Sequence, residues 1–191
     1  MPTLRIIKLG AALKKYKFEG DFKALDAGLV SKFVGDFKHG TLAPHYKSAA
    51  VPESNDDPVK IVVGSEWEKI VKDETKDVLI AYTAPWCGHC QRLAPNWEIL
   101  GEQVKDLDDL VIANMDSTAN EVEGVEIKSY PTLKWYPKGN KAGEDYTGER
   151  ILPAIEEFLM KNSESYAAMF PKEEAPKEEA PKAEAVKSEE L

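Results

Sequence analysis

Residues 77–97 read DVLIAYTAPWCGHCQRLAPNW and carry both cysteines of the chain, Cys87 and Cys90. The first seven letters form a nearly unbroken apolar run, which is typical of a strand buried on both faces of a sheet. A long helix is predicted next, from about Cys87 to Lys105, with a kink at Pro95. This order places the cysteine pair where a buried strand ends and a helix begins.

Strand and helix patterns alternate on either side of this stretch. Ser65 is predicted to cap one helix, and Pro153 to lie in the first turn of another. The order βαβαβ, then ββα, predicts an α/β fold whose central mixed sheet has helices on both faces. The predicted strands are 59–63, 77–83, 110–115, 132–136 and 145–147, and the predicted helices are 65–72, 87–105 and 151–161.

The chain divides into four segments by composition. Residues 58–163 form the main domain, and 48–57, rich in Pro, Ser, Asn and Asp, read as a linker. Residues 164–191 are predicted to be a disordered acidic tail, in which PKEEA occurs twice and then decays to PKAEA. Residues 1–47 form a lead segment.

The lead segment has a ββα pattern of its own, similar to the end of the main domain. It resembles the second half of a duplicated domain whose first half is missing. Because about 47 residues seldom make a core alone, we expect its helical stripe at Phe33 and Phe37 to be exposed, or the segment to fray. Its predicted strands are 3–9 and 15–18, and its stripe is Leu25, Leu29, Val30, Phe33, Val34 and Phe37.

Composition excludes several classes of partner. The 191 residues are 42% hydrophobic, enough for an ordinary core, and the net charge of −9 disfavours nucleic acid or an anionic membrane. No run of 18 apolar residues occurs, so we expect no transmembrane helix. Charges interrupt the apolar start, MPTLRIIKLGAALKKYKF, so it lacks a signal-peptide core, and the chain is either cytosolic or a piece whose signal lay elsewhere.

The C-x-x-C pair has a specific chemical meaning at the start of a helix. Exposed N–H groups and the positive end of the helix dipole stabilise an anion there, so Cys87 is predicted to ionise at a lower pH than a free thiol. Cys87 is then the nucleophile. Cys90, one turn further along, is in range to attack the Cys87 sulfur and release a bound partner.

Two other uses of the pair are weighed against this one. A structural zinc needs four ligands, and the chain offers only this pair with His39, His45 and His89, so we expect no metal and no cofactor. A purely structural disulfide would close so short a loop that it adds little stability.

The residues between and after the cysteines have expected roles as well. His89 either favours the Cys87 thiolate or is a solvent-exposed turn residue, and Gly88 keeps the approach to Cys87 open. Pro131 begins a strand after a turn, which makes it a candidate cis peptide. Folded beside Cys87, it would leave the backbone of Tyr130 free to pair with an extended substrate.

The motifs APWCGHC, SYPT and TGER together resemble the second catalytic domain, a′, of protein disulfide isomerases. PVKIVVG and DSTANEVEGV are similar to further parts of that domain, and KKYKF and GTLAPHYKS to the end of the preceding b′ domain. The resemblance implies a thioredoxin fold and thiol–disulfide exchange on protein substrates. It implies Trp86 as a substrate contact and Arg150 as a residue that lowers the pKa of Cys90. It also implies glutathione or an upstream thiol oxidase as redox partner.

The chain departs from that family at a buried pair. The family has a glutamate six residues before the first cysteine and a lysine on the neighbouring strand, where this chain has Ala81 and Asn114. Losing both is coherent, because either charge alone in a core would cost about 3 to 5 kcal/mol. The resulting hypothesis is that water or Arg150 assists deprotonation of Cys90, and that escape from a mixed disulfide is slower.

The resemblance also implies a location, the lumen of the endoplasmic reticulum. The last four residues, SEEL, occupy the place of the family's KDEL retention signal. The leading function is therefore an oxidoreductase and isomerase of protein disulfides. The alternative is a substrate-binding or chaperone module with only residual redox activity, in which case suppression of aggregation would survive mutation of both cysteines.

Overall fold

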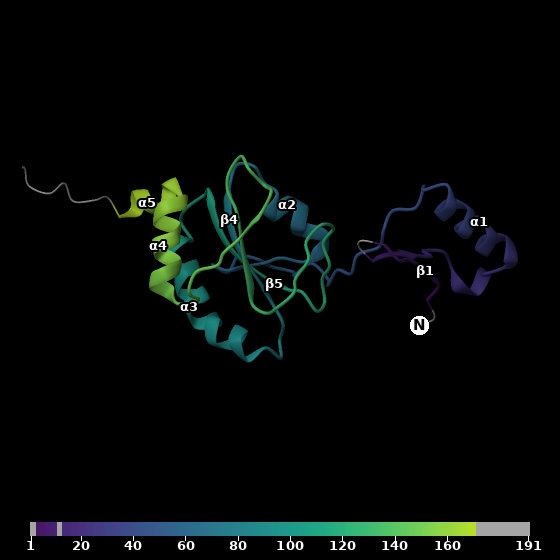
Figure 1. Cartoon of the computed structure of the whole chain (residues 1–191), viewed down its shortest axis with the longest axis horizontal. Helices are drawn as coiled ribbons and strands as arrows, with labels where there is room; N and C mark the ends of the chain where they lie inside the picture. Colours follow the sequence, from purple (N-terminus) through teal and green to yellow (C-terminus); the bar gives the residue numbers. More distant parts are fainter. Residues whose placement is uncertain (1–2, 11–12, 171–191) are drawn as a thin grey trace, which may run out of the picture.

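The computed structural model describes residues 3–10 and 13–170 (Figure 1). In the main body, five strands form one mixed sheet in the order β3-β5-β4-β6-β7. The central strand β4 is parallel to β5 and antiparallel to β6. The predicted fold class is confirmed. The elements are β3 (Lys60–Ile61), α2 (Trp67–Val71), β4 (Asp77–Thr83), α3 (Gly88–Val104), β5 (Leu110–Asp116), β6 (Thr132–Tyr136), β7 (Glu144–Asp145), α4 (Leu152–Asn162) and α5 (Glu164–Met169).

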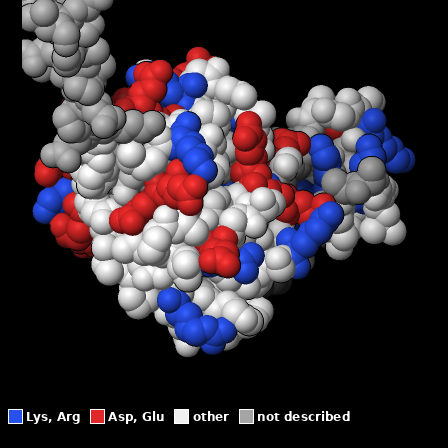
Figure 2. Space-filling model, turned by 60° about the vertical axis from the view of Figure 1, so that its left-hand side comes forward, with Lys and Arg blue, Asp and Glu red and all other residues white. Residues whose placement is uncertain are grey.

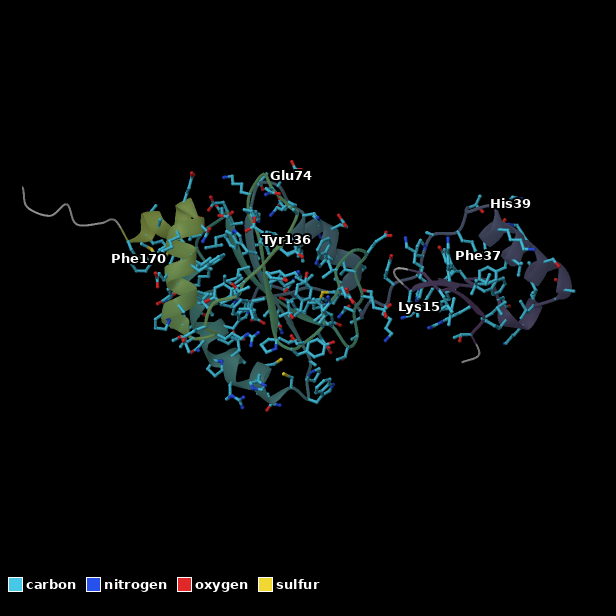
Figure 3. All side chains as sticks on the ribbon, viewed as in Figure 1. Lys15, Phe37, His39, Glu74, Tyr136 and Phe170 are labelled. Atoms are coloured by element: carbon cyan, nitrogen blue, oxygen red, sulfur yellow. The ribbon has the colours of Figure 1, made fainter. Side chains whose placement is uncertain are left out.

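Strand β4 is buried on both faces, because its alternate side chains enter two separate cores. Leu79 and Ala81 pack with residues of α3 and α4, whereas Ile80 and Tyr82 pack with α2 on the other face. Figure 3 shows side chains filling both faces of the sheet, with Tyr136 inside the larger body. The unbroken apolar run of β4 is explained by this double burial.

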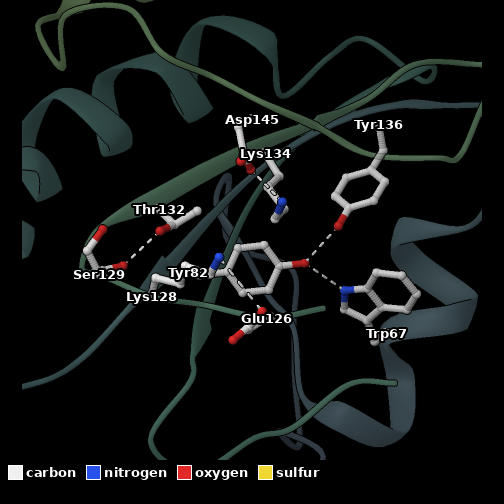
Figure 4. A network of polar contacts seen from close by, with 9 residues as sticks. All are labelled: Trp67, Tyr82, Glu126, Lys128, Ser129, Thr132, Lys134, Tyr136 and Asp145. Atoms are coloured by element: carbon white, nitrogen blue, oxygen red, sulfur yellow. Dashed lines mark hydrogen bonds and ion pairs between the residues drawn. The ribbon is translucent and has the colours of Figure 1, made fainter. Parts of the chain in front are cut away.

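Polar groups within the α2 core are paired. The Trp67 indole N–H donates to the Tyr82 hydroxyl at 2.9 Å, and the Tyr82 and Tyr136 hydroxyls lie 3.2 Å apart (Figure 4). Pairing avoids the cost of burying an unsatisfied hydroxyl. The network fixes α2 against the middle of the sheet.

The predicted cap at Ser65 is wrong. A 3₁₀ turn, Gly64–Glu66, precedes α2, and the side chain of Ser65 caps neither element. The Ser65 backbone N–H instead donates to the Ser48 hydroxyl at 3.0 Å, and the two hydroxyls lie 3.2 Å apart. A tertiary contact with the linker has replaced the local cap.

The lead segment folds as a hairpin, β1 (Arg5–Lys8) and β2 (Lys14–Lys17), covered by α1 (Ala27–Lys38). The expectation that its aromatic stripe is exposed is wrong. Phe33 is only 5% exposed, and Phe37 packs edge-on against Tyr16 with ring centroids 5.0 Å apart (Figure 3). Among its residues that the structure describes, the exposed large apolar side chains are Ile7, Leu9 and Leu13.

The segment predicted as a linker is partly attached to the main domain. The buried Asn120 accepts hydrogen bonds from the backbone N–H groups of Ala49 and Gly64, at 2.8 and 2.9 Å. Its own amide donates to the Asp116 carbonyl at 2.9 Å. At Gly64, an added Cβ would lie 2.7 Å from the Lys47 carbonyl oxygen, so the backbone just before the linker approaches as closely as a glycine allows.

The main domain extends beyond the predicted boundary at residue 163. Helix α5 begins at Glu164, and its Tyr166 is buried in the core formed by α3 and α4. The predicted boundary is therefore wrong by at least one short helix. Most of the predicted tail, residues 171–191, lies outside the described residues. Among the helices that the structure describes, none has the length and apolar character needed to cross a membrane.

Candidate active site

Cys87 lies where β4 has ended and α3 begins. It is the N-cap residue of α3, and its sulfur accepts a hydrogen bond from the backbone N–H of Cys90 at 3.3 Å. Both cysteines are buried free thiols. The open N–H groups of a helix start favour an anion at this position. The backbone therefore holds the Cys87 sulfur where a thiolate is stabilised.

The two thiols have opposite pKa shifts. A hydrogen bond from the Cys90 side chain lowers the pKa of Cys87, with further contributions from the backbone N–H groups of Cys90 and His89 and from the Arg92 charge. Burial opposes this shift. Burial also raises the pKa of Cys90 to about 11, and the hydrogen bond to Cys87 adds to the effect. As the pH rises, Cys87 is therefore the first of the two thiols to ionise, and Cys90 holds its proton at neutral pH.

The loop before β6 forms the other side of the site. The Tyr130–Pro131 peptide bond is cis, the isomer expected from the sequence. The Cys87 thiol donates to the Tyr130 carbonyl oxygen at 3.5 Å. Trp86 is 73% exposed, and its ring meets that of Tyr130 edge-on with centroids 5.7 Å apart. The exposed Trp86, the partly buried Tyr130 and a loop carbonyl thus lie beside the Cys87 sulfur.

Gly88 and His89 are exposed in the first turn of α3. The nearest atom to a Cβ added at Gly88 would be an Nη1 of Arg92, 3.9 Å away, so the approach to Cys87 over this turn is open. Arg92 is a residue that the sequence reasoning missed. Its place four residues after Gly88, on the same helix face, is the signal that could have found it.

Ala81 and Asn114 are neighbours in the sheet, paired in register between β4 and β5. Ala81 is buried, and the Asn114 side-chain oxygen accepts a hydrogen bond from the Thr83 hydroxyl at 2.9 Å. Both residues line a pocket of about 460 Å³ that Cys90 also lines. Ala81 and Asn114, which replace the charged pair of the family pattern, therefore lie near Cys90.

Arg150 is not brought to the cysteines by any described contact. It is exposed just before α4, and within residues 3–10 and 13–170 it makes no hydrogen bond or ion pair. Its role toward Cys90 stays a prediction. In the same ranges, no three His, Cys, Asp or Glu side chains gather closely enough to hold a metal ion.

A strand–helix junction with two thiols on a mixed sheet defines a dithiol protein of the thioredoxin class. The Thioredoxin family model matches residues 58–161, which is more than half of the chain. The chain belongs to this family. The solution structure of the first thioredoxin domain of mouse Protein disulfide-isomerase A4 aligns with a TM-score of 0.47 at 27% identity, covering 73% of this chain and 90% of that one.

Curated relatives extend the similarity to most of the chain. Protein disulfide-isomerase of Gallus gallus is 45% identical over 169 residues, which is 87% of this chain and 32% of the relative. The Oryctolagus cuniculus protein of the same name is 46% identical over 160 residues, 83% of this chain and 31% of the relative. That of Drosophila melanogaster is 43% identical over 165 residues, which is 86% of this chain and 33% of the relative. The chain spans about a third of the length of these relatives.

Proposed function

We propose that this chain is a thiol–disulfide oxidoreductase and isomerase that forms, reduces and rearranges disulfides in protein substrates. Cys87 is the nucleophile and Cys90 the resolving cysteine. The observation that carries the proposal is a pair of thiols one helical turn apart, with the Cys87 sulfur at the N-cap accepting from the Cys90 N–H and the two pKa values shifted in opposite directions. The similarity to protein disulfide-isomerases supports the same activity.

In the reductive direction, the Cys87 thiolate attacks one sulfur of a substrate disulfide. The substrate S–S bond breaks, a mixed disulfide forms at Cys87, and the other substrate sulfur leaves as a thiolate that takes up a proton. Cys90 then loses its proton and attacks the Cys87 sulfur. The Cys87–Cys90 disulfide forms, and the second substrate thiol is released.

The same steps in reverse oxidise a substrate dithiol. Isomerisation follows when another thiol of the substrate, in place of Cys90, attacks the mixed disulfide. The high pKa of Cys90 suits this division of labour, since it delays release and gives substrate thiols time to attack. We assign substrate contacts to Trp86 and Tyr130, a proposal supported by their edge-on contact and by the Tyr130 carbonyl beside the Cys87 sulfur.

The setting follows from the same resemblance. We propose an oxidising lumen, that of the endoplasmic reticulum, as the compartment, and glutathione or a thiol oxidase as the redox partner. We also propose that residues 58–169 are an a′-type domain and that the lead segment is the end of a b′-type domain.

Reduction of insulin by dithiothreitol in the presence of catalytic amounts of the chain tests the proposal. Wild type is expected to accelerate precipitation of the insulin B chain, and Cys87→Ser to lose the acceleration entirely. Ala168→Ser, which changes an exposed residue of α5, serves as a control for handling and folding. Equal rates for wild type and Cys87→Ser would refute the function.

A further inference from the structure

The pocket beside Cys90 is partly lined by apolar side chains, and the proposed exchange steps do not use it. Val59, Leu93 and Trp97 line it from the core, and Ala84 and Pro85 line it where the chain turns toward the first cysteine. Its volume is about 460 Å³, enough for a long side chain. It lies at the carboxyl end of β4 against Cys90, whose backbone N–H is 3.3 Å from the Cys87 sulfur.

Three carboxylates, those of Asp57, Glu98 and Asp116, also line the pocket. No Lys, Arg or His is among the lining residues, and none of the three carboxylates forms an ion pair within the described part of the chain. Asp116 accepts hydrogen bonds from the Thr118 N–H and hydroxyl, which are neutral groups. No ion pair therefore neutralises these carboxylates directly, and the neighbouring Lys60 ammonium donates to the backbone carbonyl of Asp57 at 2.8 Å and not to a carboxylate.

We propose that this pocket takes a lysine or arginine side chain of the substrate, from a residue close to the cysteine that is bound to Cys87. The inference rests on the proposed function and specifies the substrates that it prefers. Lys and Arg suit the pocket because their apolar stems can lie along Val59, Leu93 and Trp97 while the charged head meets the carboxylates. An acidic or purely apolar side chain matches only part of this lining.

Occupation of the pocket affects the second chemical step. A positive charge beside Cys90 favours its thiolate, which opposes the effect of burial on that thiol. Cys90 gives up its proton, its sulfur bonds to that of Cys87, and the bond from Cys87 to the substrate sulfur breaks. The leaving substrate thiolate takes up a proton. A substrate whose basic residue occupies the pocket is thus both bound more readily and released faster from its mixed disulfide with Cys87.

Two disulfide-bonded peptides that differ in one residue test this. One carries lysine and the other norleucine, which has the same stem without the charge, placed in turn at each position next to the reacting cysteine. At one of these positions, kcat/KM for the lysine peptide is expected to be about threefold to fivefold higher, the range of a partly exposed ion pair. The double variant Asp57→Asn/Glu98→Gln is expected to bring the ratio close to one.

A matched variant separates the pocket from the net charge of the chain. Glu68→Gln/Glu74→Gln removes the same charge from exposed residues of α2 and of the loop before β4, neither of which lines the pocket. It is expected to keep the wild-type ratio. Equal rates for the two peptides with wild type at every position, or the same loss of preference in both double variants, would overturn the inference. Failure to exchange with either peptide would instead refute the proposed function.

Discussion

Cys87 and Cys90 lie three residues apart, yet their surroundings give them different chemistry. Cys87 receives hydrogen bonds at the helix start and contacts the Tyr130 carbonyl, whereas Cys90 lies one turn further along α3, where burial disfavours its anion. A single turn of helix therefore separates a reactive thiol from a protonated one.

Alkylation with iodoacetamide should show this difference directly. At neutral pH we expect carboxamidomethylation of Cys87 alone, because its pKa is lowered and that of Cys90 is raised to about 11. The rate should rise with pH through a midpoint below the ordinary thiol value of about 8.5. Cys90→Ala removes the largest stabilising contact of Cys87 and should move this midpoint upward. Mass spectrometry identifies the labelled residue, and faster labelling of Cys90 would contradict the assignment.

Ala81 and Asn114 carry the second residue-scale prediction. The double variant Ala81→Glu/Asn114→Lys places a buried ion pair beside Cys90, where the carboxylate can accept the proton of that thiol. Escape from a mixed disulfide should become about tenfold faster, a modest effect for a general base. Quenched-flow kinetics of release measures it. Ala81→Gln/Asn114→Lys, which lacks the carboxylate, is the control, and a folded double variant that is no faster would contradict the prediction.

Much of the site could be predicted from residues that are close in sequence. The strand 77–83 has the bounds expected, and α3 begins and ends within one residue of prediction, because both carry strong local patterns. Arg92 and the acidic pocket were missed, since the pocket joins segments from Asp57 to Asp116 that only the folded chain brings together. Ser65 was misread for the same reason, because its partner Ser48 is a tertiary neighbour.

At the scale of elements, contacts among the linker, the turn after β3 and the end of β5 hold the start of the main domain in place. The Asn120 side chain hydrogen-bonds the linker at Ala49, the turn after β3 at Gly64 and the end of β5 at Asp116. A composition rich in Pro, Ser and Asp predicts that the linker is irregular, which is correct. Composition alone cannot reveal that a buried side chain, Asn120, holds the linker backbone in place. The linker is thus attached to the main domain at Ala49.

Asn120→Ala tests this attachment. The N–H groups of Ala49 and Gly64 would each lose their acceptor, so the free energy of unfolding should fall by about 2 kcal/mol. Urea denaturation followed by tryptophan fluorescence measures the change. Asn162→Ala, at the exposed end of α4, should cost less than about 0.5 kcal/mol. Equal losses of unfolding free energy in the two variants would argue against this attachment.

At the scale of the whole molecule, charge is divided between the two bodies. Residues 1–47 hold nine Lys or Arg against four Asp or Glu, although the chain as a whole has a net charge of −9. On the face seen in Figure 2, basic side chains prevail on the smaller body and acidic ones gather in patches on the larger. Lys15 and Glu121 join the bodies with a separation of 2.6 Å, and Lys14 and Glu123 with one of 3.0 Å.

The Lys15–Glu121 contact predicts a pH dependence. Burial raises the pKa of Glu121, but hydrogen bonds from Lys15 and from the Lys47 N–H outweigh it and leave the pKa lowered. The contact is therefore complete above the ordinary glutamate pKa of about 4.3 and is lost as the pH falls through the lower value. The carboxyl NMR shift of Glu121 and the amide shift of Lys47 should titrate together. Lys15→Met should raise this pKa, and an unchanged midpoint would contradict the contact.

Trapping of a mixed disulfide is the measurement that tests the central claim most directly. Each single-cysteine variant is mixed with a disulfide-bonded peptide at neutral pH, and the adducts are mapped by mass spectrometry. Cys90→Ser should accumulate the peptide on Cys87, because the attacking thiolate is present and the resolving thiol is not. Cys87→Ser should accumulate almost none on Cys90. Comparable adducts on both residues, or a faster one on Cys90, would contradict the division between nucleophile and resolving cysteine.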